Sequence, residues 1–456
     1  MVDRAVAYLE ANKDRFLSEL KDFLAFPSIS SQSAHDADVA ACAQWLRDHL
    51  KAIGLDARLV ETQGHPIVEA TGHGQSSRQL IIYGHYDVQP AETDDGWHSN
   101  PFEPLIRDGY IVGRGASDDK GPLFTHVKAI ESLVRATGGL PCNIRFLFEG
   151  EEESGGDSLK TYVEREKATL APDAVVISDT SMYDEHTAAL TYGLRGLVGM
   201  EVTARVAERD LHSGAYGGAV GNPAIALGHM IDSCIGADGR IQVAGFYDRV
   251  RPLGDWEKDT IEALGFDEQT VLNETAAPAT FGEAGCSILE RVWARPTFDV
   301  NGLFGGYLAN GMKTIIPATA TAKITMRLVP DQDPTDIFEL VASHLRANCP
   351  PFATVEIRGP FSAAPPVLFD VTSGAVEVAR EALRFGFGAE PVLVRCGGSI
   401  PVAGTFWQEL GKPVLLMGFS LDSDGAHSAN EHFRIESFLN GVKTSACFID
   451  AFARQV

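Results

Sequence analysis

Residues 79–87 read QLIIYGHYD, a continuous apolar run that ends directly in a histidine and an aspartate. Three further apolar runs are followed in the same way by residues that can bind a metal ion. They are 143–153 (NIRFLFEGEEE), 174–179 (AVVISD) and 413–427 (PVLLMGFSLDSDGAH). Continuous apolar strands are typical of parallel sheets that helices cover on both faces. Because ligands bind beyond the carboxyl ends of such strands, the four runs predict one rim lined by His, Asp and Glu.

Helical patterns surround these strands. Apolar residues recur at helical spacing between Val6 and Phe23, and again between Val39 and Ile53, where Gly54 would end the helix. A third pattern, at 121–136, lies between the first two strands. Alternating strands and helices predict the α/β class, with a parallel-rich mixed sheet covered by helices.

The pattern changes near Gly193. Alternating stretches follow at 197–206, 318–329 and 353–358, with helical patterns at 223–234 and 334–348. Alternation is typical of a sheet with one face in water, which indicates an inserted α+β domain distinct from the first domain. The predicted catalytic domain is therefore discontinuous, 1–193 and 363–456, and the inserted domain is 194–362.

Composition and charge exclude several classes of protein. Of 456 residues, 45% are hydrophobic and 22% are charged, as in globular proteins, and no apolar run is long enough to span a membrane. The net charge of −24 disfavours nucleic acid and anionic membranes as partners. The charged first twenty residues predict no secretory signal, and seven cysteines without a C-x-x-C pair suit a reducing compartment. We therefore expect a cytoplasmic protein.

The types of candidate ligand residue limit which metal ions the site could bind. A fifth element, 113–121 (GRGASDDKG), precedes the third helical pattern and adds another carboxylate to the rim. Imidazole and carboxylate without thiolate suit zinc best, with manganese or cobalt as alternatives. One ion would leave candidate ligands unused, whereas two ions that share a bridging carboxylate would use them all. One of two adjacent glutamates could then serve as a general base while the other binds metal.

These residues resemble the two-metal aminoacylase/carboxypeptidase family of metallopeptidases, and within it the branch of carnosinase and cytosolic nonspecific dipeptidase. The shared motifs, in family order, are YGHYDVQP, GRGASDDKG, FEGEEESGG, VISD, RDLHSG, ERVWARPT, KTIIPATATAK, RLVPDQDP, GGSIPV and DGAHSANEH. They run from about residue 83 to residue 433, nearly the whole chain.

The resemblance implies five metal ligands. His85 and Asp179 would bind one ion, Glu153 and His427 would bind the other, and Asp118 would bridge them. The family also has a cis peptide bond after this aspartate.

The resemblance further implies residues around the ions. Asp87 would orient His85 from behind, and Glu152 would be the general base. His432 competes with His427 by residue type, but the motif favours His427.

A third group of implied residues would bind the substrate. His212 of the inserted domain would cross a dimer interface to stabilise the oxyanion, and Arg327 would hold the C-terminal carboxylate. Gly398 and Ser399 would contact the substrate from a loop. Cys396 departs from the family, because close relatives usually carry Glu at this position.

The resulting prediction is a metal-dependent dipeptidase that cleaves the amide bond of short peptides with a free C-terminal carboxylate. The resemblance implies that it acts as a homodimer, and that the inserted domain serves as a lid or in dimerisation. The alternative with the same chemistry is an N-acyl amino acid deacylase of the acetylornithine or succinyl-diaminopimelate type. A catalytically silent binding protein on the same fold is a third hypothesis, which the retained Glu152 and metal positions disfavour.

Overall fold

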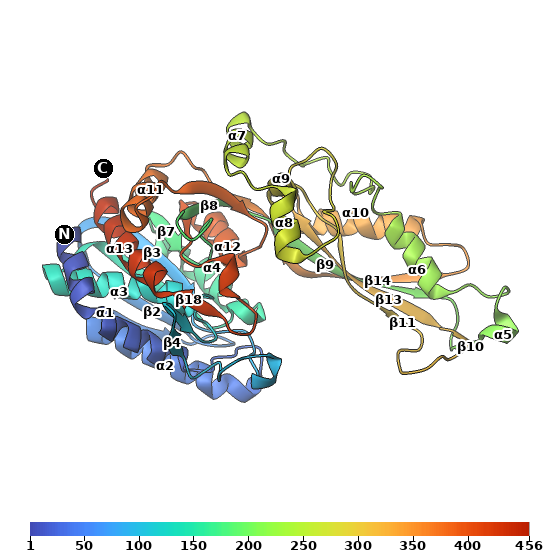
Figure 1. Ribbon diagram of the computed structural model, residues 1–456, viewed down its shortest axis with the longest axis horizontal. Coiled ribbons are helices and arrows are strands. Elements are labelled where there is room, and N and C mark those ends of the chain that lie inside the picture. Colours follow the sequence, from blue (N-terminus) through green and yellow to red (C-terminus); the bar gives the residue numbers. More distant parts are fainter. Residues whose placement is uncertain (456) are drawn as a thin grey trace. The chain divides into compact units, whose positions relative to one another are not determined.

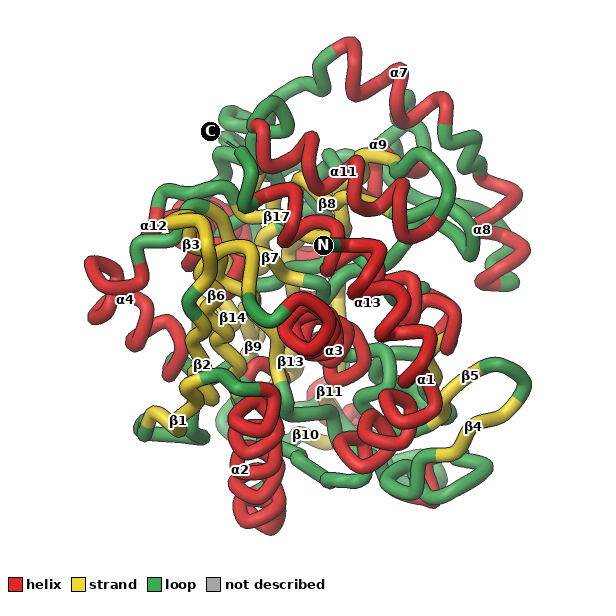
Figure 2. Tube along the Cα trace, turned by 90° about the vertical axis from the view of Figure 1, so that its left-hand side faces the viewer, coloured by secondary structure: helices red, strands yellow, loops and turns green. Residues whose placement is uncertain are grey.

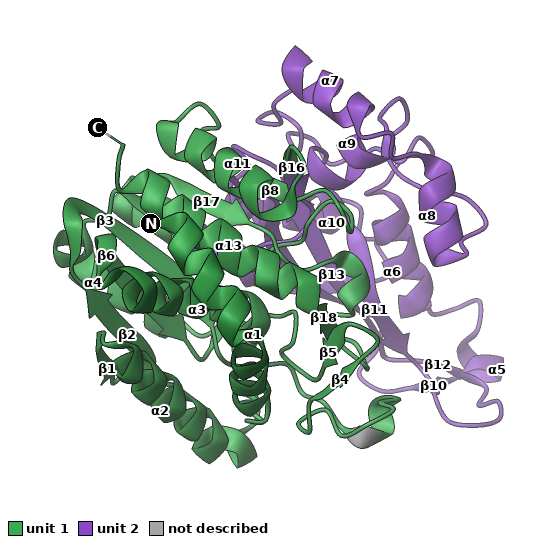
Figure 3. Ribbon diagram, turned by 60° about the vertical axis from the view of Figure 1, so that its left-hand side comes forward, with its two compact units in different colours: residues 1–192, 369–394, 405–456 green, residues 193–368, 395–404 purple. Residues whose placement is uncertain are grey.

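The computed structural model describes residues 1–455 and divides the chain into two units, coloured separately in Figure 3. Unit 1 consists of Met1–Tyr192, Phe369–Val394 and Thr405–Val456, and unit 2 of Gly193–Leu368 and Arg395–Gly404. Val456, the last residue of the predicted catalytic segment 363–456, lies outside the described residues. Unit 1 is thus assembled from three separate stretches of sequence.

A mixed sheet forms the centre of unit 1, and seven of its strands follow one another in the order β1-β2-β6-β3-β7-β17-β8. These strands are β1 (Asp56–Val60), β2 (Ile67–Gly72), β3 (Gly74–His85), β6 (Leu140–Glu149), β7 (Ala174–Ile177), β8 (Ala189–Leu194) and β17 (Val414–Met417). The four strands β6, β3, β7 and β17 run parallel, whereas β1, β2 and β8 pair antiparallel with their neighbours. The parallel-rich mixed sheet predicted from the sequence is confirmed.

Helices cover both faces of this sheet (Figure 2). They are α1 (Val2–Leu24), α2 (Asp36–Ile53), α3 (Lys120–Thr137), α4 (Ser158–Leu170), α11 (Gly374–Phe387), α12 (Pro401–Leu410) and α13 (Ile435–Phe452). Leu80 and Ile82 of β3 belong to the core formed with α1, α3 and α13. Tyr83, on the opposite face, packs edge-on against Phe406 of α12. All three β3 side chains are at most 1% exposed, which explains why this strand reads as a continuous apolar run.

A small sheet, ordered β18-β5-β4, completes unit 1. Its strands are β4 (Leu105–Arg107), β5 (Tyr110–Val112) and β18 (His432–Arg434). The pairing of β18 with β5 brings the loop before α3 beside the loop that follows β17. One loop carries Asp118, and the other carries His427 and Glu431.

Unit 2 contains a four-stranded antiparallel sheet in the order β11-β13-β9-β14, labelled in Figure 1. Its strands are β9 (Gly196–Arg205), β11 (Asp299–Gly305), β13 (Thr319–Leu328) and β14 (Thr354–Ala364). Along β13 every second residue is buried against α6 (Pro223–Asp232) and α10 (Pro334–Ala347), which pack on one face of the sheet. The alternating pattern in the sequence therefore corresponds to a sheet with one face in the core and the other exposed to solvent.

Shorter elements connect these parts of unit 2. They are β10 (Leu211–His212), α5 (Ser213–Tyr216), α7 (Asp255–Ala263), α8 (Glu268–Thr275), α9 (Ile288–Trp293), β12 (Ile315–Ile316) and β15 (Val367–Leu368), while β16 (Val392–Cys396) runs from unit 1 into unit 2. Among residues 1–455, no helix combines the length and the apolar character that crossing a membrane requires.

Candidate metal centre

The parallel strands of unit 1 deliver chemically active side chains to one rim. His85 is the last residue of β3, and Asp179 lies just beyond the end of β7. Glu153 lies in a short helical turn, η3 (Glu152–Ser154), which follows β6. His427 lies in the loop between β17 and β18, and Asp118 lies in the loop before α3. The topology thus gathers residues from five separate segments.

Two groups of possible metal ligands meet at Asp118. One group is His85, Asp118 and Asp179, and the other is Asp118, Glu153 and His427. The two carboxylate oxygens of Asp118 face different histidines: Oδ1 is 3.0 Å from Nε2 of His85, and Oδ2 is 2.9 Å from Nε2 of His427. A single carboxylate that faces both groups is the arrangement of a bridging ligand.

The electrostatics of the cluster show a shortage of positive charge. Burial raises the pKa of Asp179 well above its usual value, and the neighbouring Asp118 raises it further. Hydrogen bonds to Asp118 and Glu153 raise the pKa of His427 to about 10. When no metal cation is present, Asp179 and His427 therefore tend to keep their protons. Divalent ions would take the place of these protons. The residues present fit two divalent metal ions, and thiolate is not among the ligands.

Asp87 lies beside His85, on the side of its Nδ1 atom. Nδ1 of His85 is 3.1 Å from the carbonyl oxygen of Asp87 and 3.5 Å from its carboxylate Oδ1. The other carboxylate oxygen of Asp87 accepts hydrogen bonds from the Ser30 hydroxyl at 2.6 Å and from the backbone N–H of Glu153 at 3.1 Å. Asp87 thus connects one metal-ligand group to the other while leaving Nε2 of His85 directed at Asp118.

Glu431 is a supporting residue that the sequence analysis missed. Its buried carboxylate accepts hydrogen bonds from the backbone N–H groups of Gly115, Ser117 and Asp118, at 2.9, 2.8 and 3.1 Å. The Arg114 guanidinium donates to the same carboxylate at 2.7 Å. Glu431 therefore holds the loop that presents Asp118. Its position inside the DGAHSANEH motif was the available signal, but a partner more than three hundred residues away could not be read from it.

Glu152 lies beside the two ligand groups without belonging to either. Burial raises its pKa to about 7, and the nearby charges of Glu153, Asp118 and Asp87 raise it while His85 lowers it. A carboxylate with a pKa near neutrality can accept and return a proton at physiological pH. The adjacent Asp118–Asp119 peptide bond is cis, as the resemblance implied.

His432 is not part of either ligand group. Its Nδ1 lies 2.9 Å from the Asn430 carbonyl oxygen, its Nε2 lies 3.9 Å from Asp424, and its ring packs edge-on against Tyr110. It therefore has structural partners of its own, whereas His427 faces Asp118 and Glu153.

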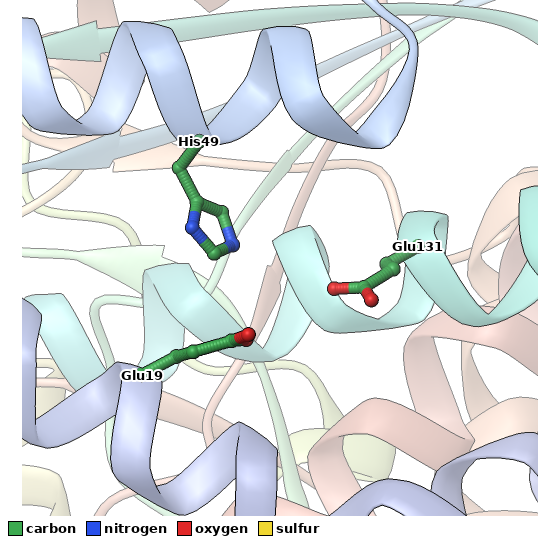
Figure 4. Close-up of side chains that lie close together, drawn as sticks. All are labelled: Glu19, His49 and Glu131. Carbon is green, nitrogen blue, oxygen red and sulfur yellow. The ribbon is translucent and has the colours of Figure 1, made fainter.

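A third cluster of possible ligands contains Glu19 of α1, His49 of α2 and Glu131 of α3, whose side chains point toward one another in Figure 4. The buried ammonium of Lys128 fills the space between them: it contacts Glu19 and lies 2.7 Å from His49 Nε2 and 2.8 Å from Glu131. Burial and then Lys128 lower the pKa of His49 to about 4, so its ring is neutral and accepts the hydrogen bond. This cluster is an ion-pair network that joins three helices.

The four remaining predicted residues lie in unit 2. His212 is exposed at the start of α5, where its Nδ1 accepts a hydrogen bond from the backbone N–H of Gly214 at 3.0 Å. Arg327 lies near the end of β13, and its Nη1 donates to the Ser399 hydroxyl at 3.1 Å. Gly398, next to Ser399, donates its backbone N–H to the Cys396 sulfur at 3.3 Å. The structure therefore brings Arg327 together with the 396–399 loop.

Comparisons with known proteins identify relatives over almost the whole chain. Residues 81–451 match Peptidase family M20/M25/M40. The Cys-Gly metallodipeptidase DUG1 of Saccharomyces cerevisiae is 31% identical, in an alignment that covers 98% of this chain and 97% of the relative.

Two solved structures have the same fold over their full length. Human carnosine dipeptidase 1 is 29% identical, with a TM-score of 0.86 and coverage of 100% of this chain and 99% of that one. An M20 family metallo-carboxypeptidase from Sulfolobus solfataricus is 30% identical, with a TM-score of 0.86 and coverage of 96% and 99%.

Proposed function

Because this chain belongs to peptidase family M20/M25/M40 and is a metal-dependent dipeptidase, we propose that it hydrolyses dipeptides with a free C-terminal carboxylate at a centre of two divalent metal ions. His85 and Asp179 would hold one ion, Glu153 and His427 would hold the other, and Asp118 would be shared by both. Zinc is the proposed ion, because imidazole and carboxylate without thiolate are ligands that zinc accepts. The observation that carries this proposal is the position of Asp118 between the two histidines.

Glu152 is the proposed catalytic residue. When bound, two divalent ions would polarise the scissile carbonyl and lower the pKa of a water molecule from 15.7 toward about 7. Glu152 takes a proton from this water as it attacks and gives the proton to the leaving amine. The raised pKa of Glu152, about 7, supports both transfers because neither protonation state is strongly disfavoured.

The substrate's C-terminal carboxylate is the proposed partner of Arg327. A guanidinium recognises a carboxylate through paired, charge-assisted hydrogen bonds. Ser399, which accepts a hydrogen bond from Arg327, and the adjacent Gly398 form the loop that contacts the substrate. This contact would make a free C-terminal carboxylate a requirement for tight binding.

The first prediction compares matched substrates. Alanyl-leucine, its C-terminal amide and N-acetyl-leucine share the leucine end but differ in the free amine and the free carboxylate. With zinc or manganese supplied to metal-free protein, we expect kcat/KM for the free dipeptide to exceed both others by at least about tenfold. If N-acetyl-leucine were hydrolysed faster than the free dipeptide, the deacylase hypothesis would be favoured over the dipeptidase. Equal hydrolysis of the amide would remove the carboxylate requirement.

A homodimer through unit 2 is proposed from the edge of its sheet. β11 is an edge strand, and three of its apolar side chains are exposed: Val300 (40%), Leu303 (66%) and Phe304 (41%). The following loop exposes Leu308 (78%) and Met312 (95%). Unpaired strand edges and contiguous exposed apolar residues are features of association surfaces. Pairing around a two-fold axis would cover them.

The second prediction concerns His212, which is proposed to reach the metal centre of the other subunit and stabilise the oxyanion. His212→Ala should lower turnover by about 10²–10³, the usual effect of losing one oxyanion donor. Metal content should stay unchanged, because His212 belongs to neither ligand group. The measurements are kcat and metal content by elemental analysis.

Mixing two inactive dimers tests whether His212 crosses between subunits. A heterodimer of Glu152→Gln and His212→Ala subunits has one site that lacks both groups and one site that keeps both. After subunit exchange, verified by native mass spectrometry, activity should rise to about a quarter of wild type on statistical mixing. Exchange without recovered activity would assign His212 to its own subunit or to no catalytic role.

A further inference from the structure

Arg195 lies at the junction between β8 and β9, and its backbone and side chain both bind the 396–399 loop. Its N–H donates to the Cys396 carbonyl at 3.3 Å, and its Nε donates to the Gly397 carbonyl at 2.9 Å. Its own carbonyl accepts a hydrogen bond from the Ser399 hydroxyl. These residues all belong to unit 2. Three hydrogen bonds thus fix the loop to one arginine.

A chain of hydrogen bonds connects Arg195 to Arg327 through this loop. Arg327 Nη1 donates to the Ser399 oxygen, and the Ser399 hydroxyl proton is committed to the Arg195 carbonyl. Because a hydroxyl has one proton, this commitment leaves its lone pairs directed at Arg327. Arg195 therefore sets the acceptor that orients the Arg327 guanidinium.

The guanidinium of Arg195 also carries an uncompensated positive charge. Its Nη1 is buried and has no hydrogen-bond partner among residues 1–455, and no ion pair with a carboxylate is found there for Arg195 or Arg327. Burial, and then the charge of Arg327, lower the pKa of Arg195 to about 10, while Cys396 and the exposed Asp299 act in the opposite direction. Two like charges held together without a carboxylate favour the binding of an anion.

Gly397 lies directly against the end of the Arg195 guanidinium. A Cβ atom on Gly397 would lie 2.9 Å from Arg195 Nη2 and 3.0 Å from Val292 Cγ1. A Cβ atom on Gly398 would meet only the Cys396 sulfur, at 3.5 Å. The loop is therefore anchored at Gly397 and open at Gly398, the side proposed to contact the substrate.

We propose that Arg195 is a positioning residue for carboxylate recognition: it aligns Arg327 through Ser399 and adds a second positive charge to the site that receives the substrate's C-terminal carboxylate. This inference rests on the proposed dipeptidase function. Arg195 need not touch the substrate, because it acts through the loop and through its charge.

The test compares Arg195→Met with Arg205→Met, an exposed arginine at the end of β9 that serves as a matched control. Kinetics are measured with alanyl-leucine and with its C-terminal amide. Arg195→Met should raise KM for the free dipeptide by about tenfold at nearly unchanged kcat, and change KM for the amide by less than about twofold. Arg205→Met should change neither. Arg195→Lys, which keeps the charge, should recover part of the loss for the free dipeptide.

A double-mutant cycle separates positioning from general loosening of the loop. In an Arg327→Met background, Arg195→Met should have less than about a threefold further effect on KM, because the guanidinium it aligns is gone. Full additivity, or equal effects on the free dipeptide and the amide, would overturn the proposal. If wild type hydrolyses no dipeptide, the proposed function has failed instead.

A second pair of variants tests the charge without touching Arg195, and it decides the proposal if Arg195→Met does not fold. Cys396→Glu places a carboxylate near the Arg195 guanidinium. Cys396→Gln introduces a side chain of nearly the same size without the charge. Cys396→Glu should raise KM for the free dipeptide by about threefold or more relative to Cys396→Gln, with the amide unaffected. Equal KM values for the two variants would overturn the proposed charge effect and, with it, the proposal.

Discussion

Removal of divalent metal ions is expected to abolish dipeptide hydrolysis, and resupply of zinc or manganese is expected to restore it. The reason is the electrostatic arrangement around Asp118. Five acidic or imidazole side chains that could bind metal converge there, and burial disfavours charge on Asp179 when no metal cation is present. Without metal, the water lacks a cation to lower its pKa, and the scissile carbonyl lacks a Lewis acid. The measurement is activity against metal content during chelation and titration back.

Metal stoichiometry provides the control for this prediction. Wild type should bind two ions per chain, and His427→Ala should bind fewer or bind them more weakly. His49→Gln should leave both the stoichiometry and the activity unchanged, because Lys128 already occupies the centre of the Glu19, His49 and Glu131 cluster. Full activity of protein shown to be free of metal would contradict the two-metal proposal.

Glu152→Gln should retain both metal ions and lose at least about 10²–10⁴ in turnover, the usual contribution of a general base. The amide has nearly the shape of the carboxylate but cannot accept the proton from water. Because Glu152 lies outside both ligand groups, metal content should not fall. Single-turnover kinetics and metal analysis of the same preparation check both parts.

Neighbouring glutamates supply the controls. Glu151→Gln should remain close to wild type in turnover, whereas Glu153→Gln should lose metal affinity, because Glu153 belongs to a ligand group with His427. If Glu152→Gln kept its turnover while Glu153→Gln kept its metal, the roles of the two glutamates would be reversed.

The family, the fold class and the enzyme class predicted from the sequence are confirmed by the relatives and the solved structures. Local patterns were most reliable where burial alone decides the structure. The run at 174–177 is β7, buried along its whole length. Gly54 ends α2 with a φ of 110°, which a glycine adopts without a steric penalty. In these places neighbours in sequence determine the fold.

Long-range contacts could not be predicted in this way. β3 begins at Gly74, earlier than the apolar run, because its polar first half pairs with β6. Glu431 reads as one more acidic residue in a loop, and only the tertiary structure reveals that it holds the loop before Asp118. The bond between Arg327 and Ser399 also joins distant segments. The catalytic and binding roles of the site residues, the dimer and the cytoplasmic location stay predictions.

The order of strands in unit 1 has a consequence for biosynthesis. β17 lies between β7 and β8, yet β7 ends at Ile177 and β17 begins at Val414. At about 5–20 residues per second, a ribosome needs on the order of ten seconds or more to make the chain between them. During that time β7 lacks its neighbour β17 on one side. All four residues of β7 are buried in the finished protein. An unpaired edge of this kind is a template for aggregation, so we expect the nascent chain to be most prone to aggregation until its C-terminal stretch emerges.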